Sequence, residues 1–491
     1  MTPEAAIAAA MLLPVVAAAL VVLTGRSRNV RDTGAALVST LTFACVSTLV
    51  PEVAAGATPR LEVMQVLPGI QLAFEVEPLG MLYALVASGL WVLTHIYAVG
   101  YMRGHHEENQ TRFFTFFCLA ISAALGIAFA ANLFTLFLFY EALTFSTFPL
   151  VAHHGSDRAK KAGRVYLGIL VSTSVGFLLL AIVWTYVAAG TMEFALGGIL
   201  EHKLSDADAG LVLALYAFGT GKAALMPFHR WLPNAMVAPT PVSALLHAVA
   251  VVKAGVFTVL KVTVYVFGLD YLHRTGLSLW LMYAASATLL IAAVIAIGRD
   301  NLKERLAYST ISHLSYIVLG AALATPAGAV GGGLHIAMHA VAKITLFFCA
   351  GAIMVASHKT QVSELDGIGR QMPITMSAFL LGSLSLIGLP PFGGAWSKWF
   401  LALGAAQSHH IVFVGVLMLS SLLGIGYLLP VAAKAFFRAP KATPGHPESD
   451  AKEAPVLCLL PLSITAVGSL LIFFFADSIH ALLAPIVRSP G

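Results

Sequence analysis

Long runs of apolar residues, separated by short polar segments, follow one another along almost the whole chain. A helix needs about 20 mostly apolar residues to span the hydrocarbon layer of a membrane, and scanning for such runs predicts about fourteen spanning helices. Their centres are expected near Val15, Phe43, Val86, Ala123, Phe139, Phe177, Ala217, Val256, Leu289, Ile317, Phe347, Leu381, Leu422 and Leu470. The pattern therefore predicts an all-α integral membrane protein in which residues 1–491 form a single integral membrane domain.

The first run, Ala5 to Leu23, is preceded by one acidic residue, Glu4, and by no basic segment. A secretory signal peptide has a basic start and a shorter apolar core. We therefore expect a first helix that is retained. The longest polar segment, Arg438 to Glu453, is rich in proline and charge and is too short to fold alone.

Composition agrees with a membrane protein that has no reactive centre of its own. Hydrophobic residues make up 59% of the 491 residues and charged residues only 10%, against about 25% charged residues in a soluble domain. The four cysteines, Cys45, Cys118, Cys349 and Cys458, stand singly in apolar runs, so neither a zinc site nor an iron–sulfur centre is expected. The P-loop pattern is absent. No cofactor is expected, and any redox or ATP chemistry would come from another chain.

Basic residues are distributed unevenly between the predicted loops. The odd-numbered loops carry nearly all loop lysines and arginines, whereas the even-numbered loops and the C-terminus carry only Arg60, Lys203, Arg274 and Arg488. Positively charged loops stay on the cytoplasmic side. The pattern predicts a multi-pass protein of the cytoplasmic membrane with both termini on the outer side.

Five lysines fall inside apolar runs rather than in loops: Lys222, Lys253, Lys261, Lys343 and Lys398. An ammonium at mid-membrane costs about 2.5 kcal/mol or considerably more. Lys261 is near the end of its run and is expected to snorkel towards the membrane surface. Among the acids, Glu141 alone is predicted deep within a span, and Asp477 is expected at the interface.

Histidines accompany these lysines. His247 and Lys253 are six positions apart, so they are expected on different sides of one helix. His335, His339 and Lys343 follow a spacing of four, which places them on one helical face, and His313 belongs to the preceding run. These residues could serve packing alone. A lone histidine often only bridges helices, Lys343 could bond a carbonyl, and Glu141 with Lys222 could form a static ion pair.

A row of lysine, histidine and glutamate in successive helices favours a proton relay. Each of these residues separately makes insertion into the membrane harder, and each can take up and release protons.

Prolines predict helix breaks beside two of the lysines. Pro227, Pro233, Pro239 and Pro241 follow Lys222, and Pro390 and Pro391 precede Lys398. Proline removes a helical donor, and such a break survives in a membrane only where protein or a water-filled cavity satisfies the backbone. Two broken helices, each with a lysine, are typical of transporters built from paired halves.

Five segments carry a resemblance to a known family. The segment from residue 221 to 255 reads GKAALMPFHRWLPNAMVAPTPVSALLHAVAVVKAG, and it resembles the signature of the proton-pumping membrane subunits shared by respiratory complex I, membrane-bound hydrogenases and Mrp-type cation/proton antiporters. The stretches NLFTLFLFYEALTFSTFPLV, HIAMHAVAKITLFF and IGLPPFGGAWSKWF are similar to the fifth, eleventh and broken twelfth helices of that family, and HIYAVGYM matches a further segment. The resemblance extends from about Glu77 to Phe437.

The resemblance implies fourteen helices, ten of them in two inverted five-helix repeats with discontinuous helices, at about 110–268 and 277–437. Carried over by position, Glu141 and Lys222 are the ion pair that gates a channel, and His247 and Lys253 continue the relay. His335, His339 and Lys343 link the halves, and Lys398 is the terminal proton carrier.

The resemblance also implies partners: other membrane subunits of a hetero-oligomeric complex, protons, sometimes Na⁺, and the lipid bilayer, with no nucleic acid. Lysine at position 398 favours a protein like the D-type chain of Mrp antiporters, because one complex I subunit of similar size has glutamate there. The stretch TFPLVAHHGSDRAKKAGRVY, with two adjacent histidines, looks closer to hydrogenase-type or complex I-like members. The alternatives are a subunit of a redox-driven complex and the membrane component of an inorganic-carbon uptake system.

Overall fold

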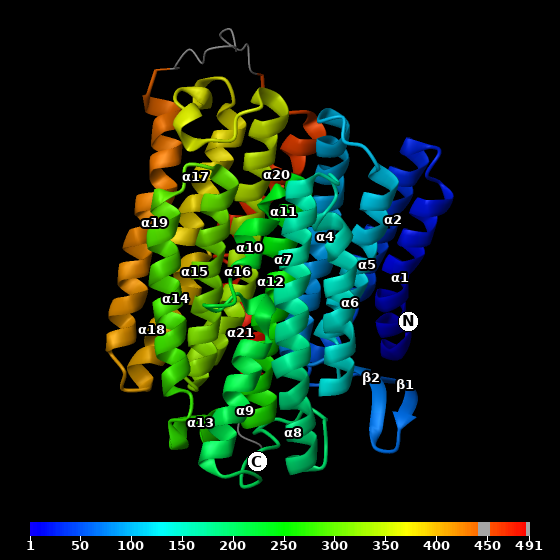
Figure 1. Cartoon of the computed structure of the whole chain (residues 1–491), viewed down its shortest axis with the longest axis vertical. Helices are drawn as coiled ribbons and strands as arrows, with labels where there is room; N and C mark the ends of the chain where they lie inside the picture. The colour runs from blue at the N-terminus through cyan, green and yellow to red at the C-terminus, as the bar shows by residue number, and fades with distance from the viewer. Residues whose placement is uncertain (440–451, 488–491) are drawn as a thin grey trace.

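The computed structural model describes residues 1–439 and 452–487. Helices that stand side by side, most of them along the long axis of the molecule, make up nearly all of it (Figure 1). The middle of the long polar segment between Arg438 and Glu453, and Arg488, for which loop positions were predicted, lie outside the described residues.

The first half of the chain contains most of the irregular structure. Its elements are α1 (Pro3–Leu23), α2 (Arg28–Ser47), α3 (Val50–Ala54), β1 (Arg60–Leu67), β2 (Ile70–Glu75), α4 (Pro78–Gly104), α5 (Gln110–Ala128), α6 (Leu133–Val151), α7 (Asp157–Thr173), α8 (Leu179–Ala189), α9 (Asp206–Gly219), α10 (Trp231–Asn234), α11 (Thr240–Ala244) and α12 (Val251–Val262). A π-helical turn, Leu245–Val249, joins α11 to α12, and two others, Ser174–Leu178 and Thr263–Phe267, extend α7 and α12.

The second half is more regular. Its helices are α13 (Leu269–Thr275), α14 (Leu279–Gly298), α15 (Leu302–Ala322), α16 (Pro326–Ser357), α17 (Pro373–Ile387), α18 (Gly394–Gln407), α19 (Val412–Phe437), α20 (Val456–Leu471) and α21 (Ala476–Leu483).

Among the described residues, 10 helices are long and apolar enough to cross a membrane, or 11 if the bent pair Val456–Leu471 and Ala476–Val487 counts as one span. All the expected helix centres lie in helical segments. Three of those centres lie in α9, α15 and α17, which do not meet this criterion: α9 and α17 are only 14 and 15 residues long. The membrane fold is confirmed, and the count of fourteen spans stays a prediction.

One helical segment forms the centre of the molecule. The segment Thr240–Phe267, which includes α11 and α12, is 100% buried, whereas the helices at the edge, α1 and α2, are less than half buried. In Figure 1 α12 lies in the middle, with α1 and α2 at one side and α18 and α19 at the other. Side chains of α12 therefore contact protein and not lipid, so polar groups there can find polar partners.

A small antiparallel sheet corrects the expectation of an all-α protein. Strands β1 and β2 pair from Arg60 opposite Glu75 to Leu67 opposite Ile70. Arg60 anchors the hairpin through ion pairs of 3.2 Å to Glu75 and 2.9 Å to Glu193. Period-two alternation is too short here to stand out beside the long apolar runs, so the hydropathy pattern did not predict it.

The chain breaks its helices close to Lys222 and Lys398, as the prolines predict. Helix α9 ends at Gly219, and a short 3₁₀ turn with Lys222 at its centre follows. Helix α17 ends at Ile387, and α18 begins only at Gly394. Gly388, between them, has φ 89°, a conformation that glycine adopts without strain.

Candidate functional site

Lysine and histidine side chains from α12, α15 and α16 meet at the centre of the bundle. The Lys253 Nζ of α12 lies 2.7 Å from the His339 Nδ1 of α16. The His339 ring centroid is 5.3 Å from that of His313 on α15. The His313 ring is stacked on His335, with an interplanar angle of 6° and 3.2 Å between His313 Nδ1 and His335 Nε2. These four side chains are all at most 3% exposed.

The row continues towards the broken helix α18. His335 Nδ1 lies 2.9 Å from the hydroxyl of Ser397, and His335 also stacks on the ring of Tyr316. Lys398, the residue after Ser397, places its Nζ 5.1 Å from the centre of that same Tyr316 ring. The Lys398 ammonium donates to the carbonyl of Ile387 at 2.7 Å and to the Ser421 hydroxyl at 2.8 Å. The free carbonyl end of α17 therefore receives a donor from the lysine beside the break.

Lys343 occupies a branch of its own. Its Nζ donates to the Ser309 hydroxyl at 2.7 Å, and Ser309 donates to the Tyr427 hydroxyl at 3.1 Å. Lys343 is one helical turn after His339 on the uninterrupted helix α16, as the spacing of four predicts.

Lys222 contacts α6 beside Glu141 without touching its carboxylate. The Lys222 ammonium donates to the carbonyl of Tyr140 at 2.9 Å and to the hydroxyl of Thr144 at 2.6 Å, and it lies 3.2 Å from the centre of the Tyr140 ring. Both carboxylate oxygens of Glu141 are buried without a hydrogen-bond partner. The expected direct ion pair is thus not formed, because the backbone and hydroxyl groups on either side of Glu141 take up the ammonium's donors.

A glycine lets α12 approach the break that carries Lys222. A Cβ atom placed on Gly255 would lie 2.2 Å from the backbone nitrogen of Ala223, a distance that no side chain can adopt. The lysine turn therefore packs against α12, two residues along the helix from Lys253. The two parts of the site share this contact.

His247 lies in the π-helical turn Leu245–Val249. Its ring centroid is 4.7 Å from that of Phe347 on α16, and neither ring nitrogen has a hydrogen-bond partner. His247 and Lys253 thus both contact α16, so the prediction that they point to different sides was wrong. The π-helical turn and Ala250, with φ −109° and ψ −74°, interrupt the regular rotation per residue on which it rested.

Lys261 does not snorkel, which corrects a further expectation from the sequence. Its side chain is 1% exposed, and its Nζ lies 3.1 Å from Glu77 Oε1 and 2.9 Å from the carbonyl oxygen of Ala130. Tyr265 donates to the other Glu77 oxygen at 2.9 Å. Glu77 also caps α4 by accepting from the backbone of Leu79 and Gly80. Glu141 is therefore not the only buried acid; Glu77 was missed because it precedes its helix instead of lying within an apolar run.

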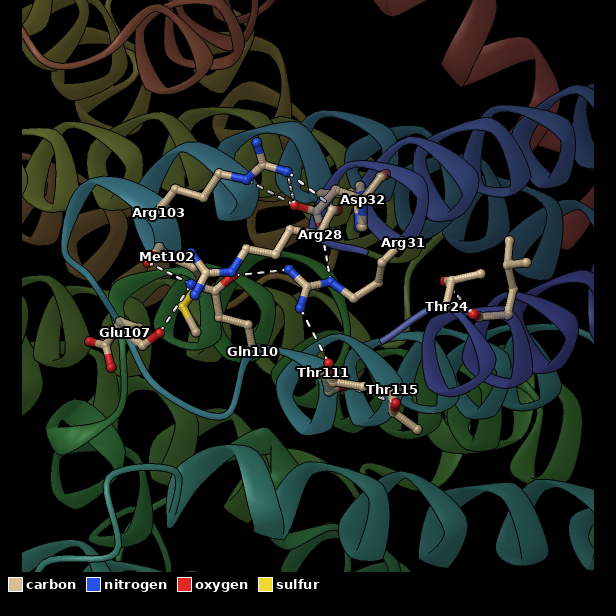
Figure 2. A network of polar contacts seen from close by, with 12 residues as sticks. Thr24, Arg28, Arg31, Asp32, Met102, Arg103, Glu107, Gln110, Thr111 and Thr115 are labelled. Carbon is tan, nitrogen blue, oxygen red and sulfur yellow. Dashed lines mark hydrogen bonds and ion pairs between the residues drawn. The ribbon is translucent and has the colours of Figure 1, made fainter. Parts of the chain in front are cut away.

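A second acid that the apolar pattern did not reveal is Asp32. Figure 2 shows Asp32 between two arginines: Arg31 Nε donates to it at 2.7 Å and Arg103 Nη2 at 2.5 Å. Asp32 is 5% exposed, and its carbonyl contacts His95. The network fastens α2 to α4 and lies apart from the central row. Asp477 is exposed in the first turn of α21.

The hydroxyl partners of the row were also missed. Serine, threonine and tyrosine are common in membrane helices, so their presence alone does not indicate which of them contact the row. A usable signal was their spacing, since Ser309 precedes His313 by four positions and Tyr316 follows it by three, which places them on the face of that histidine.

The arrangement can hold and pass protons. A neutral imidazole accepts at one nitrogen and donates at the other, so each histidine can receive a proton on one side and release it on the other. Lysine donates only while charged, and a short contact such as that of Lys253 with His339 lets the two share one proton. Lys253, His313, His335, His339 and Lys343 are all buried, so these proton-carrying groups are held away from bulk water.

Comparison with known proteins shows the family to which this chain belongs. Residues 130–424 match the family described as NADH:quinone oxidoreductase/Mrp antiporter, TM, and residues 68–114 match the family described as NADH-Ubiquinone oxidoreductase (complex I), chain 5 N-terminus. The NADH-quinone oxidoreductase subunit N of Desulforudis audaxviator is 32% identical over 84% of this chain and 83% of its own length.

Other relatives are longer than this chain. The NADH-quinone oxidoreductase subunit L of Mycobacterium tuberculosis is 32% identical over 82% of this chain, which spans 63% of that protein. The probable K(+)/H(+) antiporter A/B subunit of Rhizobium meliloti is 30% identical over 92% of this chain, which spans 46% of its length.

Solved structures share the fold over nearly the whole chain. A chain of the Mrp complex from Dietzia sp. DQ12-45-1b superposes with a TM-score of 0.88 and 22% identity over 99% of this chain and 97% of its own. A chain of the membrane-bound sulfane sulfur reductase, an archaeal respiratory membrane complex, superposes with a TM-score of 0.83 and 22% identity over 98% and 78%. With the matched segment covering more than half of its residues, this chain belongs to the family of antiporter-like membrane subunits shared by NADH:quinone oxidoreductases and Mrp antiporters.

Proposed function

We propose that this chain is the proton-conducting subunit of a multisubunit Mrp-type monovalent cation/proton antiporter of the cytoplasmic membrane. The observation that carries the proposal is the buried row of contacts from Lys253 through the histidines to Ser397, beside the half-buried Lys398. A row of titratable groups on adjacent helices, each within reach of the next, is a typical intramembrane proton path.

The proposed relay consists of Glu141, Lys222, His247, Lys253, His313, His335, His339, Lys343 and Lys398. A proton on Lys253 passes to His339 Nδ1 across their short contact. His339 then gives up a proton from Nε2 towards the stacked pair of His313 and His335, and His335 passes it on towards the broken helix. Each step leaves the donor ready for reprotonation from the side of Lys222 and His247.

Two paired breaks support an arrangement in repeats. One half, at about 110–268, has a broken helix with Lys222, and the other, at about 277–437, has one with Lys398; in each the lysine donates to a backbone carbonyl, Tyr140 in the first and Ile387 in the second. We infer fourteen spanning helices in which these halves are inverted repeats of five helices. Helices too short or too polar to span alone, α9, α15 and α17, belong to this core.

The partners proposed for the chain are other membrane subunits, and the coupled ions are protons and a monovalent cation such as Na⁺. The superposition with a chain of an Mrp complex, which covers nearly the whole of both chains, supports this assignment, as does lysine rather than glutamate at position 398. The relatives named above include subunits of larger membrane complexes.

A subunit of a redox-driven proton pump is the second candidate. It is favoured by the relative from Desulforudis audaxviator, a NADH-quinone oxidoreductase subunit that this chain matches over most of both lengths. In that case the same relay would be driven by electron transfer in another subunit.

Purification of the chain with its natural partners separates the two candidates. The complex is reconstituted in liposomes that contain a pH-sensitive dye, and a Na⁺ or K⁺ gradient is imposed. Proton movement driven by the gradient, and lost in Lys253→Met, is expected for the antiporter. Iron–sulfur subunits in the complex, with proton movement only during quinone reduction, would establish the second candidate instead. Absence of proton movement under both conditions contradicts both.

A further inference from the structure

Three histidines gather around one carboxylate at the end of the bundle that the charge distribution predicts to be cytoplasmic. Glu107, in the turn between α4 and α5, accepts contacts at Oε1 from His105 Nδ1 at 3.1 Å and from His154 Nε2 at 3.2 Å. His153 Nε2 lies 3.9 Å from Oε2. The Glu107 side chain is only 7% exposed, whereas that of His154 is 38% exposed. The two adjacent histidines follow α6, and the relay does not use them.

Backbone contacts fix this histidine cluster, formed by His105, Glu107, His153 and His154. Gln110 donates to the carbonyl oxygens of Glu107 and Met102, and Arg31 in turn donates to Gln110 at 2.9 Å (Figure 2). His153 Nε2 also contacts the carbonyl of Glu108 at 3.1 Å, and His154 Nδ1 contacts that of Val237 at 3.1 Å. Contacts from α2, from α5 and from the residues after α6 thus hold the turn that carries Glu107, so its carboxylate has a fixed position between the histidines.

The cluster lies between two hollows. A cavity of about 530 Å³ has His105, Glu107 and His154 in its wall, and a second of about 270 Å³ shares these three residues. The wall of the larger cavity also includes Thr240, the first residue of α11, and Ala350 and Met354 of α16. The cavity therefore reaches from the histidine cluster to α16 and to the segment that continues into α12, the helices that carry Lys253 and His339.

Helix geometry leads from this cavity to the relay. On α16 the positions Lys343, Phe347, Ala350 and Met354 are spaced by four, three and four, so they lie on one face. His247, whose ring contacts Phe347, is seven residues after Thr240, or about 10 Å along a helix. His247 is thus the relay residue nearest to Thr240 along this segment, and its ring nitrogens have no hydrogen-bond partner in the protein.

The charges around the cluster favour a proton held at His154. The hydrogen bond with Glu107 raises the pKa of His154 above its ordinary value, more than burial lowers it. Burial raises the pKa of Glu107, but the hydrogen bond and charge of His154, with smaller contributions from His105 and His153, lower it on balance. Burial lowers the pKa of His153. Further charged or titratable groups face the cluster or its cavities from neighbouring elements: Tyr101, His106, Glu108, Arg112, Arg158, Lys161, Lys303, Glu304, His358 and Lys359.

We propose that the histidine cluster is a proton-collecting site that takes protons from the adjoining aqueous phase and feeds them through the larger cavity to His247. This inference rests on the proposed proton transport and deepens it. The exposed His154 exchanges its proton with the bulk, Glu107 holds the resulting positive charge in place, and the released proton moves into the cavity. The site returns to its starting state when His154 takes up the next proton.

The pH dependence of transport tests the site. In liposomes where the pH on the cluster's side is varied and the other side is fixed, we expect Glu107→Gln and His154→Gln to move the midpoint of proton uptake about one pH unit to the acid side, which is roughly tenfold less uptake at the alkaline end. At saturating acidity the rate of proton uptake in both variants should match wild type, because the high proton concentration in the bulk phase makes a collecting site unnecessary. His202→Asn is the matched control, because this exposed histidine also contacts a glutamate, Glu201 at 3.5 Å, but lies in a loop away from the cluster and has φ 59°, where asparagine is tolerated; its midpoint should stay in place.

A titration independent of transport completes the test. Histidine NMR of the purified complex should show a His154 pKa above that of a free histidine, falling in Glu107→Gln. The proposal is wrong if His154 has the pKa of a free histidine and that pKa is the same in Glu107→Gln. It is also wrong if both variants keep the wild-type midpoint of transport. If wild-type complex moves no protons, the proposed function fails as well, and that outcome is distinct from variants that transport with a wild-type midpoint.

Discussion

The imidazole of His339 lies where the two halves of the proposed relay meet, with Nδ1 beside Lys253 and Nε2 without a hydrogen-bond partner. An unpaired buried nitrogen is costly, of the order of 1–3 kcal/mol. Packing alone would favour a residue that leaves nothing unpaired. Among protein groups Nε2 therefore has no competing partner, and the ring of His313 lies 5.3 Å away, centre to centre.

His339→Gln separates titration from packing. The amide oxygen of glutamine can still accept from Lys253, but it takes up no proton near neutral pH. We expect this variant to assemble normally and to lose most transport per assembled complex. His339→Leu, which also removes the hydrogen bond, should be less stable in thermal unfolding. Near-normal transport in His339→Gln would identify a packing histidine.

The ammonium of Lys222 leads to a second residue-scale prediction. Lys222→Ala removes a charge that is fully buried and leaves the carbonyl of Tyr140 and the hydroxyl of Thr144 without their donor, which costs about 1–3 kcal/mol. We expect the variant to insert with reduced stability and to lose proton-coupled transport. The control is Lys160→Ala, on a side chain that is 63% exposed, which should change neither. Wild-type transport by well-expressed Lys222→Ala would contradict a role in the relay.

At the scale of elements, the contact of α12 with the lysine turn depends on Gly255. Gly255→Ala would place a methyl group 2.2 Å from the backbone of Ala223, so the turn must move and Lys222 with it. We expect a loss of about 1–3 kcal/mol, as for an overpacked core, measured as a lower unfolding temperature, together with reduced transport.

Gly168→Ala is the matched control for that variant. Gly168 is also helical, but a Cβ there meets nothing within 4 Å. The substitution should be neutral or raise stability by about 0.5–1 kcal/mol, because alanine favours a helix more than glycine does. Equal effects of the two substitutions would mean that the close approach of α12 to the turn is not important.

The sequence predicted elements better than it predicted contacts. Apolar runs located all the long helices, since length and hydropathy are local properties. The spacing of four placed His335, His339 and Lys343 on one face because α16 is regular. The same reasoning failed for His247 and Lys253, because a π-helical turn is decided by packing. It failed for Lys261 too, since its partner Glu77 is far away along the chain.

At the scale of the whole molecule, the asymmetry of basic loops predicts an orientation. Single cysteines placed at Lys160 and Asp206, in a background with Cys45 changed to serine, report it; the other three cysteines are buried. In intact cells an impermeant thiol reagent should label the cysteine at Asp206 and not the one at Lys160. Permeabilised cells, in which both should react, control for accessibility. Labelling at Lys160 alone would reverse the topology.

The complete burial of the segment Thr240–Phe267 has a consequence for biosynthesis. The segment carries Lys253 and Lys261, and each lysine at a helix centre opposes insertion by about 2.5–3.5 kcal/mol. The partner of Lys261, Glu77, is synthesised earlier, whereas His339, the partner of Lys253, is synthesised 86 residues later. Until His339 has been synthesised, Lys253 has no partner. We therefore expect this helix to stay beside the earlier helices or the insertion machinery and not to enter the lipid. The contact between Lys253 and His339, in the middle of the proposed relay, is thus formed out of chain order, and only after α16 has been synthesised.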